Sequence, residues 1–309
     1  GAVPPEPAPP RERSPERLPE KVVLSDTTLR DGEQMPGVAF SPEEKLELAT
    51  ALARLGVPLI EAGYPAVSAE ELQAVRAIVD AGLDAVIQVI ARPVPADSEA
   101  AVESGAHSIA LFICTSDAHL TAKLRTTRAG LLARIREGVA LAAQSGRTVV
   151  FAAEDATRTD PDFLVAAYLT AAEAGADALG LADTAGVCTP WRMGELVRHV
   201  TDRCPLPLAV HCHNDLGLAT ANSVAGLLAG ASGVQCSVLG VGERAGNAPL
   251  EEVAMVLEVA FGHRTGLDLT GLTPLAHRVA ALTGQSVPPG RPVVGGHAFT
   301  HESGLHVDG

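Results

Sequence analysis

The sequence predicts a (β/α)8 TIM barrel, a fold of the α/β class, and three observations lead to it. Apolar runs typical of strands alternate with helical patterns roughly every 25–35 residues, which gives about eight βα units. These runs are continuously apolar, as in parallel sheets that are covered on both faces. Glycines, which commonly end helices, lie between helix and strand at Gly56, Gly82, Gly105, Gly146, Gly175 and Gly230. A doubly wound open sheet is the alternative, but no G-x-G-x-x-G follows the first strand.

The expected elements follow in chain order from the first apolar run, Val22–Leu24. Ser41, Pro42 and two acidic residues form a typical helix start, so the first helix should run through Leu55. Further strands are expected at 57–62, 85–91, 108–114, 148–153, 178–182, 208–213 and 234–239. The helices after them are expected near 69–80, 96–104, 127–144, 161–174, 190–202, 217–229 and 249–261.

Composition divides the chain into three parts. Residues 1–20 are rich in Pro, Glu and Arg and have little to bury, so they are expected to be a disordered extension. Residues 21–262 hold the barrel, which is expected to be the catalytic domain. Residues 263–309 depart from the βα pattern, contain a Gly/Pro-rich stretch, and are expected to be the start of a truncated C-terminal extension.

Charge and cysteine usage limit the function classes. The formal net charge is −14, with no run of Lys or Arg inside the expected barrel, so nucleic acid and anionic membranes are poor partners. Aromatic residues make up only 3% of the chain, so Ala, Val and Leu must build the core. The five cysteines are scattered, as reduced and mostly buried thiols would be. With no apolar stretch of membrane-spanning length and no signal-peptide pattern, a cytoplasmic enzyme is expected.

The strongest local signal for chemistry is the pair His211 and His213, which follows the apolar run 206–210. Residues i and i+2 of a strand point to the same face, so the two imidazoles should lie side by side. With a carboxylate from elsewhere they would suit a divalent metal, although two surface histidines at a strand end are the alternative. Asp31 is the natural carboxylate, because strands 1 and 7 are two apart around a closed barrel. This mixed site does not distinguish Mg²⁺, Mn²⁺ and Zn²⁺.

Polar side chains gather where the expected strands end, which is where TIM barrels carry their reacting groups. They are Arg30, Asp31, Glu61, Arg92, Glu154, Asp155, Asp183, Thr184, His211, His213, Glu243, Arg244 and Asn247. The opposite end of the barrel has the glycines. A ring of structural ion pairs is the alternative to a catalytic rim.

Several motifs, in order along the chain, carry a family resemblance. They are DTTLRDGEQ at 26–34, LADT at 181–184, HCHNDLGLATAN at 211–222, GERAGNA at 242–248 and FTHESGLHVDG at 299–309. From about residue 22 to the end, the chain resembles the DRE-TIM metallolyase superfamily. Within it the chain is similar to the Claisen-condensing homocitrate, 2-isopropylmalate and citramalate synthases. The nitrogen-fixation type of homocitrate synthase is the closest fit, and relatives acting on phosphono- or phosphinopyruvate look similar.

The resemblance implies a role for each matching residue. Asp31, His211 and His213 would bind the metal, with Asn247 as a further ligand. Thr184 would hold the carboxylate of a 2-oxo acid that chelates this metal. Arg30 would polarise its ketone, and Gln34 would help to position the substrate.

The co-substrate implied by the resemblance is acetyl-CoA. His306 resembles the base that removes a proton from the acetyl methyl group, with Glu154 as its acidic partner. In this family the partner subunit contributes that histidine, so a homodimer with shared active sites is expected. Without the resemblance, His306 would be interpreted as a histidine of the chain's tail.

Three further groups have less specific interpretations. The GERAGNA loop after strand 8 could bind coenzyme A phosphates or shape the metal site through Asn247, and the second is preferred. His297, His301 and Cys212 are interpreted as structural, because Cys212 alternates with the two histidines and should face away from them.

Substrate choice depends on the residues that would meet the distal end of the 2-oxo acid. Lysine-pathway homocitrate synthases have a histidine and an arginine for the distal carboxylate where this chain has Ile90 and Val150. Arg92, at a strand end, is the candidate cation for a distal carboxylate, phosphonate or phosphinate, although it could stay in solvent or pair with Glu61. The predicted function is an acetyl-CoA:2-oxo acid acyltransferase, homocitrate synthase-like. 2-Isopropylmalate, citramalate and phosphono- or phosphinomethylmalate synthases are alternatives, as are a carbon–carbon lyase and a non-catalytic binding module.

Overall fold

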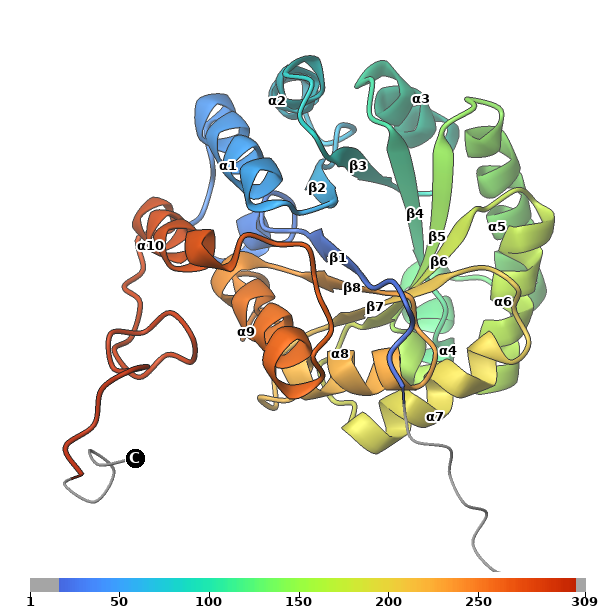
Figure 1. Cartoon of the computed structure of the whole chain (residues 1–309). Helices are drawn as coiled ribbons and strands as arrows, with labels where there is room; N and C mark the ends of the chain where they lie inside the picture. Colours follow the sequence, from blue (N-terminus) through green and yellow to red (C-terminus); the bar gives the residue numbers. More distant parts are fainter. Residues whose placement is uncertain (1–16, 304–309) are drawn as a thin grey trace, which may run out of the picture.

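The computed structural model describes residues 17–303 and forms a closed barrel of eight parallel strands inside a ring of helices (Figure 1). The strands follow one another around the barrel in chain order, and β8 pairs with β1 to close it. The strands are β1 Val23–Asp26, β2 Leu59–Gly63, β3 Val86–Ala91, β4 Ser108–Cys114, β5 Thr148–Glu154, β6 Ala178–Asp183, β7 Leu208–Cys212 and β8 Gly233–Cys236. The predicted TIM barrel is therefore confirmed.

The eight predicted helices begin and end close to the predicted positions, and the described residues also form α4 and α10, which were not predicted. The helices are α1 Pro42–Leu55, α2 Ala69–Asp80, α3 Pro95–Glu103, α4 Asp117–His119, α5 Arg128–Ala143, α6 Pro161–Glu173, α7 Pro190–Thr201, α8 Ala219–Leu228, α9 Leu250–Met255 and α10 Leu272–Leu282. At the start of α1, Ser41 and Glu44 form a reciprocal capping box. All six glycines predicted to end helices have a positive φ, from 59° to 113°, which side chains rarely tolerate.

One predicted strand end was wrong, and one predicted helix has the expected extent but changes its form. The eighth strand stops at Cys236 rather than 239, because the chain turns through a 3-10 segment, Val238–Gly240, in which Leu239 has a φ of 59°. The last predicted helix, 249–261, ends as an α-helix at Met255 and continues as a π-helix over Val256–Ala260. Both departures lie after β8, where the chain leaves the repeating βα pattern.

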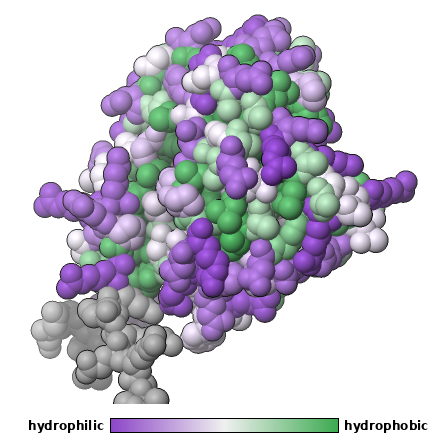
Figure 2. Space-filling view, turned by 90° about the vertical axis from the view of Figure 1, so that its right-hand side faces the viewer, coloured by the Kyte–Doolittle hydropathy of each residue, from purple (hydrophilic) through white to green (hydrophobic). Residues whose placement is uncertain are grey.

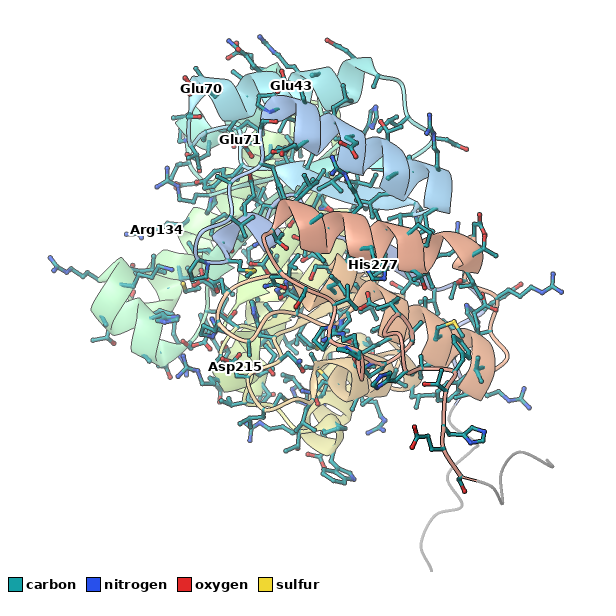
Figure 3. All side chains as sticks on the ribbon, turned by 90° about the vertical axis from the view of Figure 1, so that its left-hand side faces the viewer. Glu43, Glu70, Glu71, Arg134, Asp215 and His277 are labelled. Carbon is teal, nitrogen blue, oxygen red and sulfur yellow. The ribbon has the colours of Figure 1, made fainter. Side chains whose placement is uncertain are left out.

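The helix α10 was not predicted, and Figure 3 shows it, with His277, lying beside α1. Leu275 and Val279 are buried on its inner side. On the outside, the Arg278 guanidinium forms two 2.6 Å contacts with the carboxylate of Glu47 on α1. Regular secondary structure therefore continues beyond residue 262. The predicted domain boundaries stay predictions.

The barrel interior contains a cavity, and small inward-facing residues on three neighbouring strands contribute to it. TIM barrels usually fill their interior with bulky branched residues. Here β4, β5 and β6 point Ala110, Ala152 and Gly180 inward, where these residues line a cavity of about 630 Å³. On β4 and β5, the large apolar side chains of Leu111 and Phe151 point outward and are fully buried under the helices.

The outer surface is mixed. Figure 2 shows hydrophilic residues over much of one side, with apolar ones between them. No helix among residues 17–303 is both long and apolar enough to cross a membrane. The five cysteines are free and buried, as the sequence predicted.

Candidate active site

Three of the predicted metal ligands meet at the carboxyl ends of β1 and β7. The two Nε2 atoms of His211 and His213 lie 3.0 Å apart. The Asp31 Oδ2 atom lies 3.4 Å from Nε2 of His211 and 3.9 Å from Nε2 of His213. A tight turn places Asp31 there, since the carbonyl of Thr27 accepts hydrogen bonds from the backbone N–H groups of residues 30, 31 and 32. We call these three residues the Asp–His–His cluster.

The Asp–His–His cluster has the chemistry that a divalent cation needs. Burial and the neighbouring His211 lower the pKa of His213 to about 3, so its imidazole is neutral and keeps a lone pair. Burial alone would raise the pKa of Asp31, but Arg30 and His211 outweigh it and lower this pKa well below its ordinary range. Both Asp31 oxygens are buried and lack a hydrogen-bond partner among the described residues. Such orphaned oxygens beside the neutral imidazole of His213 fit a bound metal.

Asn247 lies next to this cluster, as the sequence suggested. Its backbone forms an isolated β-bridge with His213. Its Nδ2 atom donates a hydrogen bond to the carbonyl of Val241 at 3.1 Å, whereas its buried Oδ1 has no partner among the described residues. The free Oδ1 leaves Asn247 available as an additional oxygen ligand, and its ligand role stays a proposal.

Arg30 is held at the edge of the cavity by a network of side chains. Its Nε donates to Glu61 Oε1 at 2.6 Å, and its Nη1 lies 3.6 Å from Asp31 Oδ1. Gln235 donates to the other oxygen of Glu61 at 3.0 Å. Gln34 accepts a long hydrogen bond of 3.4 Å from Arg30. The network fixes the guanidinium beside the Asp–His–His cluster, where both Arg30 and Gln34 line the cavity.

Thr184 lines the same cavity at the end of β6. Its Oγ1 accepts a hydrogen bond from the backbone N–H of Asp155 at 2.9 Å, so its own hydroxyl proton is left to donate. Arg244 of the GERAGNA loop donates to the Thr184 carbonyl at 2.7 Å and pairs with Asp215 at 2.8 Å. Figure 3 labels Asp215.

The GERAGNA loop is shaped to reach over this site. Gly246 has a φ of 84°, and a Cβ there would lie 1.9 Å from the carbonyl oxygen of Gly240. The carbonyl of Gly246 accepts a hydrogen bond from the backbone N–H of Asn214. The loop therefore lies against the end of β7, which favours its role in shaping the site over binding coenzyme A phosphates.

Glu154 also lines the cavity, at the end of β5. Its carboxylate accepts hydrogen bonds from Lys123 Nζ at 2.9 and 3.3 Å. The same ammonium lies 3.1 Å from Cys114 Sγ. His306, the predicted base, lies outside the described residues.

The structure does not bring Arg92 into the cavity. Its guanidinium forms two 2.8 Å hydrogen bonds with Asp97 and is 60% exposed. Of the two alternatives, Arg92 stays largely in solvent, whereas it does not pair with Glu61, which pairs with Arg30 instead. Ile90 and Val150 do line the cavity, so its wall is apolar there as predicted.

Comparisons with known proteins identify the family of this chain. The model of the HMGL-like family matches residues 21–279. The chain belongs to the HMGL-like family. The resemblance to the DRE-TIM superfamily predicted from the motifs is thereby confirmed.

Relatives of this HMGL-like chain have different names at equal similarity. It is 48% identical over 292 residues to the "Probable 2-isopropylmalate synthase" of Methanopyrus kandleri, covering 94% of this chain and 58% of that protein. It is also 48% identical over 290 residues to homocitrate synthase AksA of the same organism, covering 94% and 73%. The chain thus spans little more than half the length of the first of these relatives.

A solved structure shares the fold. Hydroxymethylglutaryl-CoA lyase from Pseudomonas aeruginosa superposes with a TM-score of 0.77 at 27% identity, over 87% of this chain and 95% of that chain.

Sequence reasoning missed Lys123 in this HMGL-like chain. The segment after β4 was interpreted only as a connection to the next helix. It forms α4 and then a π-helix, Leu120–Leu124, that brings Lys123 to the cavity. A lysine four residues after a histidine, just beyond a strand end, is the signal that could have found it.

Proposed function

We propose that this chain catalyses the condensation of acetyl-CoA with a 2-oxo acid, giving a 2-substituted malate and free coenzyme A. The observation that carries the proposal is the Asp–His–His cluster beside Arg30 at the mouth of a large cavity. Membership of the HMGL-like family and the names of the relatives support the same reaction class.

In this proposal Asp31, His211 and His213 hold a divalent metal, with Asn247 as a further ligand. The metal, when bound, would supply Lewis-acid polarisation of the 2-oxo acid. The orphaned oxygens of Asp31 and Asn247 support these assignments.

Arg30 and Thr184 act directly on the 2-oxo acid. The Thr184 hydroxyl donates a hydrogen bond to the carboxylate of the acid, and Gln34 helps to orient the substrate. The Arg30 guanidinium, which Glu61 holds in place, donates to the ketone oxygen and stabilises the negative charge that develops there.

Proton removal from the acetyl methyl group is assigned to His306, with Glu154 as its acidic partner. Glu154 lies at the cavity mouth at the end of β5, which is four strands from β1 and two strands from β7. A carboxylate there can orient an imidazole and stabilise its protonated form. We further propose a homodimer, in which His306 of each chain completes the site of its partner.

For the acceptor, we propose a 2-oxo acid with a second acidic group, as in homocitrate synthesis. Arg92 no longer supports this choice. Lys123, which lines the cavity, is the cation left to meet a distal anion. An apolar acceptor, as in 2-isopropylmalate synthesis, is the second candidate, because Ile90, Ala110 and Val150 form an apolar wall.

Thiol release from acetyl-CoA tests the proposal, measured with divalent metal against a panel of 2-oxo acids. We expect release that depends on both the metal and the acceptor. A preference for 2-oxoglutarate over 2-oxoisovalerate would support the first candidate, and the reverse would support the second. If no thiol were released with any acceptor and the chain cleaved a 3-hydroxyacyl-CoA instead, the chain would be a lyase and the proposed synthase activity would be wrong.

A further inference from the structure

A second group of metal-ligating side chains lies at the ends of β4 and β5. Cys114 is the last residue of β4, Glu154 is the last of β5, and His119 ends α4 between them. One ligand atom from each lies within 4.8 Å of the other two. Cys114 is buried, whereas His119 and Glu154 are partly exposed. We call these three residues the β4–β5 cluster.

The β4–β5 cluster already surrounds a positive charge. The ammonium of Lys123 lies 3.1 Å from the Cys114 sulfur and 2.9 Å from the nearer oxygen of Glu154. The Lys123 side chain is 55% exposed, however, and an ion pair this exposed is weak. The long side chain can therefore turn into solvent and leave its position to another cation.

His119 has a ring nitrogen that lies beside a buried carboxylate. Its Nδ1 atom lies 3.5 Å from Oδ2 of Asp155, a fully buried carboxylate. Ser116 and Arg158 donate hydrogen bonds to that carboxylate and fix its position. The contact between His119 and Asp155 is not a hydrogen bond, and Nδ1 of His119 is buried without a hydrogen-bond partner among the described residues, so the nitrogen remains available to a metal.

We propose that the β4–β5 cluster is a regulatory site for a thiophilic divalent cation such as Zn²⁺, bound by Cys114, His119 and Glu154 when Lys123 withdraws. The Cys114 thiol releases its proton to solvent as the sulfur–metal bond forms. A sulfur ligand favours Zn²⁺ or Cd²⁺ over Mg²⁺ and Mn²⁺, so the cluster stays in its lysine-filled state with the latter ions.

Occupation of the β4–β5 cluster would stop the reaction. The carboxylate of Glu154 would be bound to the metal and no longer available to the base. This consequence rests on the proposed function, whereas metal binding itself does not. Low zinc would support activity through the Asp–His–His cluster, and excess zinc would inhibit.

Cadmium binding to the full chain tests the site without an activity assay. After removal of metals by a chelator, Cd²⁺ should produce the ultraviolet absorption of a cadmium–thiolate bond, with two ions bound per chain. Cys114→Ala should lose this absorption and one ion. Cys204→Ala, which removes another buried thiol, should keep the absorption and both bound ions. Absence of the absorption in the unmodified chain, or its persistence in folded Cys114→Ala, would overturn the proposal.

Two further variants should shift cadmium affinity in opposite directions. Lys123→Met removes the competing ammonium, so half-saturation should need at least about tenfold less Cd²⁺. His119→Ala removes a ligand and should require at least about tenfold more. Unchanged affinity in both folded variants would refute the site, even if Cys114→Ala could not be purified.

Inhibition tests the regulatory consequence separately. Excess Zn²⁺ should inhibit the unmodified chain at least about tenfold more strongly than Cys114→Ala, each compared with its own activity in Mg²⁺. Equal inhibition would contradict regulation through the cluster. If no condensing activity were found at all, the proposed function would fail, and the cadmium results would still decide whether the site exists.

Discussion

Replacing Arg30 by lysine separates the charge of this side chain from its geometry. The guanidinium reaches Glu61 through Nε at 2.6 Å and directs Nη1 toward Asp31 at 3.6 Å. A lysine ammonium has no planar fork, so one that pairs with Glu61 cannot keep both directions. The variant should keep the positive charge and the fold but lose donation to the ketone oxygen.

The expected size of this effect follows from the loss of one fixed donor. Removing one such donor typically costs about 10²–10³-fold in turnover, which corresponds to about 2.7–4 kcal/mol of transition-state stabilisation. Steady-state thiol release at saturating 2-oxo acid measures it, with circular dichroism as the control for folding. Turnover within about threefold of the unmodified chain would show that Arg30 has only a structural role.

Three further predictions concern the metal, the exposed arginine and pH. Asp31→Ala or His213→Ala should abolish activity and metal binding while leaving the barrel folded, and full activity in either chelator-treated variant would refute the ligand assignment. Arg92→Ala should leave the KM for every 2-oxo acid nearly unchanged but lower the free energy of unfolding by about 1 kcal/mol, because the buried Asp97 loses an exposed partner. A selective rise in KM for dianions would restore the original assignment. Burial raises the pKa of Asp26 to about 7, so between about pH 4 and 7 the folded chain holds a proton that the unfolded chain has lost. The free energy of unfolding should therefore fall as pH rises through this range, by at most about 4 kcal/mol. Asp26→Asn should flatten this dependence in urea titrations, and a pH profile identical to that of the unmodified chain would contradict the prediction.

The repeating part of the fold was predictable because its signals are local. Continuous apolar runs, the Ser41 helix start and the six glycines each depend on a few neighbouring residues, and all of them hold in the structure. The helix α10 was not predictable in this way. It follows a stretch that departs from the βα pattern, and its place is decided by packing against α1.

The candidate site also has a part that was predictable from local signals and a part that was not. Asp31, His211 and His213 could be expected to meet, because parallel strands end at one rim and alternate residues share a face. The partners of Arg92 and Lys123 could not be predicted. Arg92 turns back to Asp97 within its own loop, and Lys123 reaches Glu154 through a π-helix that periodicity does not reveal.

Transfer of the acetyl carbons is the most direct test of the central claim. The chain would be incubated with divalent metal, a 2-oxo acid and acetyl-CoA labelled with ¹³C in the acetyl group, and the products analysed by mass spectrometry. The account predicts that both labelled carbons appear in a new 2-substituted malate, in step with thiol release, and that none appear with Asp31→Ala. Label found only in free acetate would contradict it, because the chain would then hydrolyse the thioester without forming a carbon–carbon bond.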